Sequence, residues 1–140
     1  MRLFLSTLFA LTTLFNAALF ADNQTDPMTA SAAAASNWLQ LVDDGKYADS
    51  WATSSQQMQL VMSKGEWVKL LNAVRHPLGS VNHREIAQQR PAENPKGLAP
   101  GDYMVILYQT AFSNRPKGEE LVTLSLGYDG KWRVLTYQVK

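Results

Sequence analysis

After the first 21 residues, the pattern of apolar and polar positions along the chain changes once, close to Pro77. Before Pro77, apolar residues recur every three or four positions, which is typical of amphipathic helices. After it, apolar and polar residues alternate, which is typical of strands. The pattern therefore predicts an α+β domain in which three N-terminal helices pack on a curved, four-stranded antiparallel meander.

Three helices are expected, over residues 26–44, 47–62 and 63–75. The first opens with Asp and Pro, a pair suited to an N-cap and the first helical position, and ends before a glycine. The third opens with a capping box, Ser63 to Glu66, and stops before His76-Pro77. The second is expected to continue beneath the sheet, and its apolar positions are Tyr47, Trp51, Met58, Leu60, Val61 and Met62.

Strands are expected over residues 80–89 and 103–112, followed by a hairpin over residues 119–140. The first of these is polar and is therefore predicted to lie at an edge of the sheet. Residues 103–112 are apolar on both faces, which predicts a central strand. Residues 90–101, which are rich in Pro and Gly, are expected to form a long, irregular hairpin loop between these two strands.

The hairpin turns at Tyr128-Asp129-Gly130, and two loops fit this sequence. A two-residue type I′ turn would pair Leu126 with Arg133. A three-residue loop with Gly130 in the left-handed region pairs Gly127 with Lys131, and it separates apolar from polar side chains more cleanly, so we predict this loop. The apolar face then holds Val122, Leu124, Leu126, Trp132 and Val134, while Leu135, Tyr137 and Val139 lie on the opposite face.

Residues 1–21 differ in kind from the rest of the chain. Arg2 precedes a Leu/Phe-rich run, and Ala21 offers a cleavage site before a polar leader. This pattern predicts a secretory signal peptide, export to the periplasm or the cell exterior, and a single mature domain over residues 22–140. The alternative is an uncleaved membrane anchor, because the apolar run is nearly long enough to span a bilayer.

Composition excludes several classes of function. Apart from Arg2, basic and acidic residues balance at 12 each, which argues against a nucleic acid or, after cleavage, a membrane as partner. The chain has no cysteine and only two histidines, His76 and His83, without carboxylates at ligand spacing. No glycine motif that cradles a phosphate is present. We therefore expect no metal and no cofactor.

Several motifs along the chain resemble a bacterial family. They are the Ala-Ala-X-X-Trp-Leu-X-Leu-Val-Asp-X-Gly-X-Tyr-X-X-Ser-Trp pattern of residues 34–51, Trp67, Arg75 to Gly79, Arg84, Pro100 to Tyr103, Glu120 and Asp129 to Val134. Together they resemble a family of secreted proteins known only as a domain of unknown function. The resemblance implies the cystatin-like roll of nuclear transport factor 2 and ketosteroid isomerase. It implies no activity.

His83 and Glu85 are the best acid–base candidates, because they lie two apart on one face of a predicted strand. Enzymes of the implied roll place acid–base residues between helices and sheet. The alternative is a pair of ordinary polar side chains on an exposed edge strand. We favour this alternative and expect no catalytic residue, because no third residue completes a site.

Arg75 and Arg84 are candidates for an anion-binding site near the mouth of the roll. The alternative is that they pair with Asp43, Asp44 or Glu120 and hold helices to sheet, and this alternative is favoured. The aromatic residues are mostly expected in the core, although some would line a cavity. The candidate binding residues are Arg75, Arg84, Tyr108 and Trp132.

These observations favour a non-catalytic module that binds a small apolar ligand or a protein. The alternative is a small-molecule acid–base enzyme that resembles ketosteroid isomerase or a dehydratase. An ionisable pair buried deep in the pocket would favour the enzyme, and its absence would favour the module.

A homodimer is also expected. The strand over residues 103–112 is apolar on both faces, and helices can cover only one of them. In the predicted register, Leu135, Tyr137 and Val139 extend the uncovered face. A second copy of the sheet covers it better than the loop over residues 90–101, which has only Ala92, Leu98 and Ala99 to bury.

Overall fold

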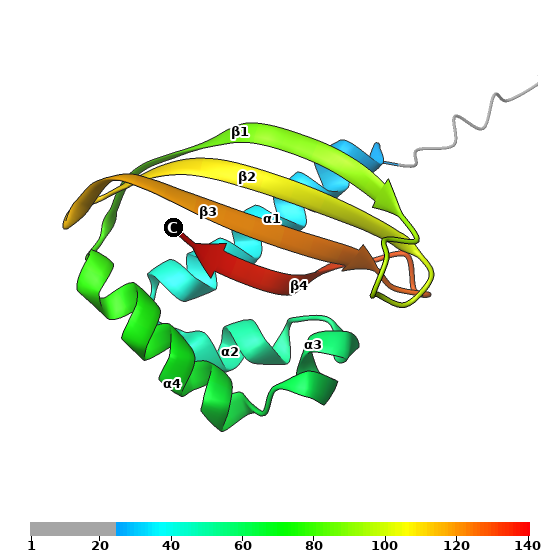
Figure 1. Cartoon of the computed structure of the whole chain (residues 1–140), viewed down its shortest axis with the longest axis horizontal. Helices are drawn as coiled ribbons and strands as arrows, with labels where there is room; N and C mark the ends of the chain where they lie inside the picture. Colours follow the sequence, from blue (N-terminus) through cyan, green and yellow to red (C-terminus); the bar gives the residue numbers. More distant parts are fainter. Residues whose placement is uncertain (1–24) are drawn as a thin grey trace, which may run out of the picture.

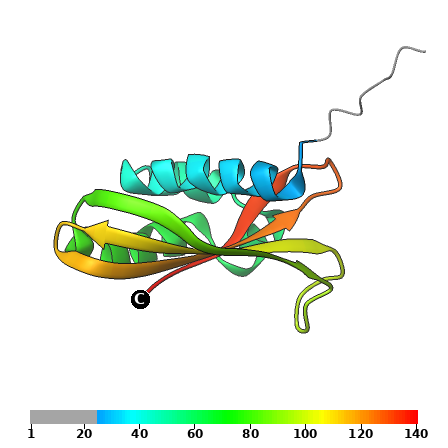
Figure 2. The same cartoon turned by 90° about the horizontal axis from the view of Figure 1, so that it is seen from above.

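Helices cover one face of a four-stranded antiparallel sheet in the computed structural model, which describes residues 25–140 (Figure 1). The predicted α+β fold, with N-terminal helices packed on a meander, is confirmed. Seen from above, α1 (Pro27–Asp43) crosses one face of the sheet (Figure 2). The predicted signal peptide and its cleavage site lie outside the described residues.

The first and last helices follow the predicted caps. Asp26 accepts a hydrogen bond from the backbone of Thr29 and opens α1. Ser63 and Glu66 form the reciprocal capping box of α4 (Lys64–Arg75), which passes into a short 3-10 turn, His76–Leu78.

The expected second helix is divided into α2 (Tyr47–Ala52) and α3 (Gln56–Val61). Ser55 starts the new helix, because its hydroxyl accepts from the amide of Met58 while its own amide donates to the carbonyl of Val134. The continuation does not pack beneath the sheet at its end, since Leu60 and Val61 are 78% and 83% exposed.

The strands are β1 (Val81–Glu93), β2 (Asp102–Phe112), β3 (Arg115–Leu126) and β4 (Trp132–Val139), and neighbours in the chain are neighbours in the sheet. The strand over residues 102–112 is internal, as predicted, and β1 is an edge. The loop between them is shorter than expected, because pairing continues as far as Glu93 opposite Asp102.

The hairpin between β3 and β4 has the predicted three-residue loop. Leu126 pairs with Trp132, and the amide of Gly127 donates to the carbonyl of Lys131 at 2.9 Å. Gly130 has φ of 73°, the left-handed conformation that such a loop requires.

The face assigned to the end of β4 is wrong, because β4 contains a bulge. Thr123 pairs with Thr136 whereas Leu124 pairs with Val134, so Leu135 is an extra residue. A single extra residue exchanges the faces of all side chains beyond it. Leu135 is buried, and Tyr137 turns toward the helices, with its ring 5.3 Å from that of Trp38.

The core lies between α1, α4 and the inner face of the sheet. Trp38 and Trp67 contact each other there, with ring centroids 5.9 Å apart. Both indole nitrogens donate to Ser50, Trp38 to its carbonyl and Trp67 to its hydroxyl. The polar atoms of these two buried tryptophans are thus satisfied, as packing in a dry interior requires. Within residues 25–140, no helix is both long and apolar enough to cross a membrane.

Candidate functional site

Four charged side chains meet where α1 and α4 end against the sheet. Arg84 of β1 donates through Nη1 and Nη2 to both carboxylate oxygens of Asp43 at 2.7 and 2.9 Å. Through Nε and Nη2 it also donates to Glu120 of β3 at 2.6 and 3.2 Å. Arg75 of α4 donates to Asp43 at 2.7 Å and lies 3.7 Å from Glu120. We call Asp43, Arg75, Arg84 and Glu120 the charge cluster.

Glu120 is the centre of the charge cluster and is completely buried. Besides Arg84, its carboxylate accepts from the hydroxyl of Thr110 at 2.6 Å and from that of Tyr137 at 2.5 Å. These donors come from β2 and β4, on either side of β3. The burial of one carboxylate is therefore compensated by three side chains from three different strands.

The environment keeps Glu120 ionised. Burial alone would raise the pKa of Glu120. The hydrogen bonds and the positive charge of Arg84, together with the hydrogen bonds from Thr110 and Tyr137, outweigh burial and lower this pKa below its ordinary value. Burial opposes the charge of Arg84, yet hydrogen bonds to Asp43 and Glu120 raise its pKa. The buried carboxylate and guanidinium are thus held in their charged forms.

Tyr108 and Tyr137 remain neutral beside this cluster. Burial raises the pKa of Tyr108 to about 12, with the charge of Arg84 opposing and that of Glu120 adding to the shift. Burial, followed by the negative charge of Glu120, also raises the pKa of Tyr137. Among the described residues, the Tyr108 hydroxyl and the Nε and Nη1 atoms of Arg75 have no hydrogen-bond partner. The Arg75 guanidinium stacks on Phe112, 4.7 Å from the ring centroid.

The sequence-predicted residues are only partly brought together. Arg75, Arg84 and Tyr108 lie in or beside the charge cluster, and the two arginines form the ion pairs expected of the structural alternative. Trp132 lies at the other end of the sheet, half-buried and paired with Leu126. Sequence reasoning missed Tyr137, because it assumed one unbroken alternation along β4. The adjacent apolar residues Val134 and Leu135, where the alternation changes phase, are the signal that could have revealed the bulge.

His83 and Glu85 do not lie inside the roll. Their side chains are 68% and 66% exposed, with 3.6 Å between Nε2 and Oε2. His83 and Glu85 are therefore polar side chains on an exposed edge strand, the alternative that the sequence favoured. No group of side chains able to hold a metal ion occurs in residues 25–140.

A groove of about 820 Å³ opens at the opposite end of the molecule from the charge cluster. There α3, the β1–β2 loop and the β3–β4 hairpin gather, at the right-hand end of Figure 1. We call it the hairpin groove. Its lining is rich in hydroxyl, amide and charged side chains: Ser54, Ser55, Gln56, Gln57, Gln59, Asp102, Tyr103, Ser125, Tyr128, Asp129 and Arg133.

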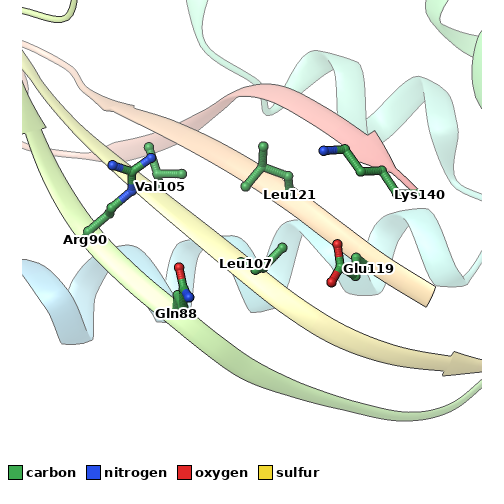
Figure 3. A pocket seen from close by; sticks show the side chains of 7 residues that line it. All are labelled: Gln88, Arg90, Val105, Leu107, Glu119, Leu121 and Lys140. Atoms are coloured by element: carbon green, nitrogen blue, oxygen red, sulfur yellow. The ribbon is translucent and has the colours of Figure 1, made fainter. Parts of the chain in front are cut away.

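A second, smaller hollow of about 230 Å³ lies on the sheet itself. Figure 3 shows its side chains on the side of the sheet that faces away from the helices. Val105, Leu107 and Leu121 form its apolar centre, with Arg90 on one side and Glu119 on the other. We call this surface the outer patch.

Comparison with known proteins places the chain in a family. Residues 34–137 match the family described as "Protein of unknown function (DUF4019)". The chain belongs to DUF4019. The match runs from the middle of α1 through most of β4, and therefore includes both the charge cluster and the hairpin groove. No curated protein matches the chain.

Solved structures share the fold of this DUF4019 chain at low identity. A protein from Catenulispora acidiphila is 13% identical, with a TM-score of 0.52 over 80% of this chain and 88% of its own. ActVI-ORFA from Streptomyces coelicolor is also 13% identical, with a TM-score of 0.50 over 80% of this chain and 94% of its own. The resemblance to the nuclear transport factor 2-like fold is thereby confirmed, and it concerns architecture alone.

Proposed function

We propose that this DUF4019 domain is an exported, non-catalytic module that binds an extended segment of another polypeptide in the hairpin groove. The observation that carries the proposal is the groove itself. Its volume of about 820 Å³ falls within the range of natural ligand sites, and three separate chain segments form its walls.

The chemistry of the groove suits a polypeptide better than a small apolar ligand. Gln56 and Gln57 supply amide groups, which can donate to and accept from a peptide main chain. Asp129 is paired with Arg133 at 2.7 Å, whereas Asp102 has no ion-pair partner among the described residues. The groove therefore carries a net negative charge and favours a segment with a basic side chain.

The enzyme alternative has one observation in its favour, because buried ionisable groups are present between helices and sheet. Their environment argues against acid–base work. A general base at neutral pH needs a pKa near 7, whereas the pKa of Glu120 is lowered and the pKa values of Tyr108 and Tyr137 are raised. Each of these shifts moves the pKa further from 7. The charge cluster is therefore better suited to holding the helices against the sheet than to acid–base catalysis.

Peptide titration followed by nuclear magnetic resonance tests the proposal. The probe is a capped peptide of about six residues with one central lysine, an extended length of about 20 Å. We expect the amide signals of Gln57, Tyr103 and Gly127 to shift. A matched peptide with glutamate in place of lysine should bind several-fold more weakly.

Two variants complete this test. Asp102→Asn should weaken binding of the lysine peptide, whereas Glu85→Gln, which changes an exposed carboxylate outside the groove, should leave it unchanged. Absence of binding by both peptides, or shifts centred on Glu120, would contradict the proposal.

Export is proposed from the apolar run of residues 1–21 and the polar residues that follow it. The intact mass of protein recovered from the periplasm should correspond to a chain that begins at Asp22. A full-length mass in the membrane fraction would instead support the uncleaved anchor.

A further inference from the structure

The outer patch leaves aliphatic side chains in contact with solvent at the centre of the sheet. Val105, Leu107 and Leu121 are half-buried and face away from the helices (Figure 3). We propose that the outer patch binds a second copy of this chain in a two-fold dimer, in which Arg90 of each copy pairs with Glu119 of the other.

The area of the sheet face that carries the outer patch is large enough for such a dimer contact. A strand of 11 residues, as in β2, is about 36 Å long, and a sheet of four strands is about 19 Å wide. The resulting face of about 700 Å² is close to the roughly 800 Å² that each partner contributes to a standard interface.

Three charged side chains surround the outer patch: Arg90 on one side, and Glu119 with Lys140 on the other. Of these, Arg90 and Glu119 are of opposite sign and can pair between copies under two-fold symmetry. Arg90, from β1, has no ion-pair partner among the described residues. Glu119, from β3, accepts a hydrogen bond from Gln109 at 3.0 Å but has no ion pair there either. The two lie on opposite sides of the apolar centre in Figure 3. A two-fold axis that lies in the interface, passes midway between them and runs perpendicular to the line that joins them sets each Arg90 against the partner's Glu119.

The β1–β2 loop, the segment that the sequence offered as an alternative cover for this face, lies at the hairpin groove and not on the outer patch. The β1–β2 loop contributes Ala99, Pro100 and Gly101 to the hairpin groove, and the Tyr103 hydroxyl donates to the carbonyl of Ala99 at 2.6 Å. The outer patch is lined by residues of the strands and by Lys140 alone. Because Leu135 and Tyr137 turn inward, the apolar centre of this face is smaller than the sequence pattern predicts and lies on β2 and β3, with polar side chains around it.

Charge-reversal variants, compared by analytical ultracentrifugation, test the pairing. Each is purified in the form that the cell produces. The unaltered protein should be a dimer at micromolar concentration. Arg90→Glu and Glu119→Arg should each weaken dimerisation by at least about tenfold, because like charges then face each other. The double variant should regain the dimer. An equimolar mixture of the two single variants should form the heterodimer.

Two further variants separate charge pairing from general effects. Leu107→Asp should yield monomer with an unchanged circular dichroism spectrum, because this side chain lies outside the core. Lys69→Glu, an exposed reversal on α4, should remain a dimer. A monomeric unaltered protein would overturn the proposal. A double variant that stays as weak as the single variants would overturn the pairing of Arg90 with Glu119.

Discussion

Arg84 and Glu120 face each other across β2, and the guanidinium contacts the carboxylate through Nε at 2.6 Å. The other edge of the same guanidinium donates, through Nη1 and Nη2, to both carboxylate oxygens of Asp43 at the end of α1. One side chain therefore connects an edge strand, an internal strand and a helix. Each of these contacts joins residues far apart in sequence, so the charge cluster is a product of the complete fold.

Removing Arg84 should destabilise the domain severely. Arg84→Ala leaves the completely buried Glu120 with fewer donors, and loss of one partner of a buried ion pair typically costs about 3–5 kcal/mol. Urea unfolding measures this change in the free energy of unfolding. Arg133→Ala, which breaks the exposed pair with Asp129, serves as the matched control and should change it far less. Equal costs would contradict the structural role of the cluster.

The two tyrosines beside Glu120 should differ in the importance of their hydroxyl groups. Tyr137→Phe removes a donor to a buried carboxylate and should cost about 1.5–3 kcal/mol. Tyr108→Phe should be nearly neutral, because that hydroxyl has no partner among the described residues. Thermal and urea unfolding of both variants provide the comparison. If Tyr108→Phe were the more harmful change, the arrangement around Glu120 would be wrong.

The register of the hairpin can be tested at Trp132. Because this indole is half-buried against the core, Trp132→Ala should cost about 2–3 kcal/mol, less than the roughly 3–5 kcal/mol expected for the buried Trp38. Denaturant unfolding of Trp132→Ala and Trp38→Ala gives both values. A negligible cost at Trp132 would place it on the outer face and contradict the three-residue loop.

Stability should fall in acid because of Glu120. Its pKa in the folded protein is lowered from 4.5, so the unfolded chain binds the proton more readily. The stabilisation is therefore fully present above about pH 4.5 and is lost as pH falls through the lowered value. Urea midpoints measured between pH 7 and pH 3 should decline in this window. A midpoint that rises as pH falls would contradict the assignment.

The order of helices and strands could be predicted from sequence because its causes are local. The capping box at Ser63, the proline at position 77 and the turn at Asp129-Gly130 act within a few residues of themselves. The break between α2 and α3 escaped prediction, because Ser55 begins α3 partly through a contact with Val134 on the last strand. Local patterns do not report such a contact.

The site was less accessible to sequence reasoning than the fold. Arg75, Arg84 and their carboxylate partners could be proposed, since buried arginines require partners. The inward turn of Tyr137 depends on the extra residue Leu135 in β4. The sequence marks this position by a change of phase in the alternation at Val134-Leu135, but the residues next to the turn decide the predicted loop, and the prediction carries the same phase on to Val139. The hairpin groove is formed by three segments distant in the chain, and none of them carries a motif of its own.

The titration of Glu120 tests the central claim, that the interior between helices and sheet is a structural tie and not a catalytic centre. The measurement is the pH dependence of the side-chain carboxyl carbon chemical shift by nuclear magnetic resonance. We predict that Glu120 stays ionised throughout the neutral range, with a midpoint below 4.5. A midpoint between about 6 and 7, as suits a general acid or base, would contradict this account.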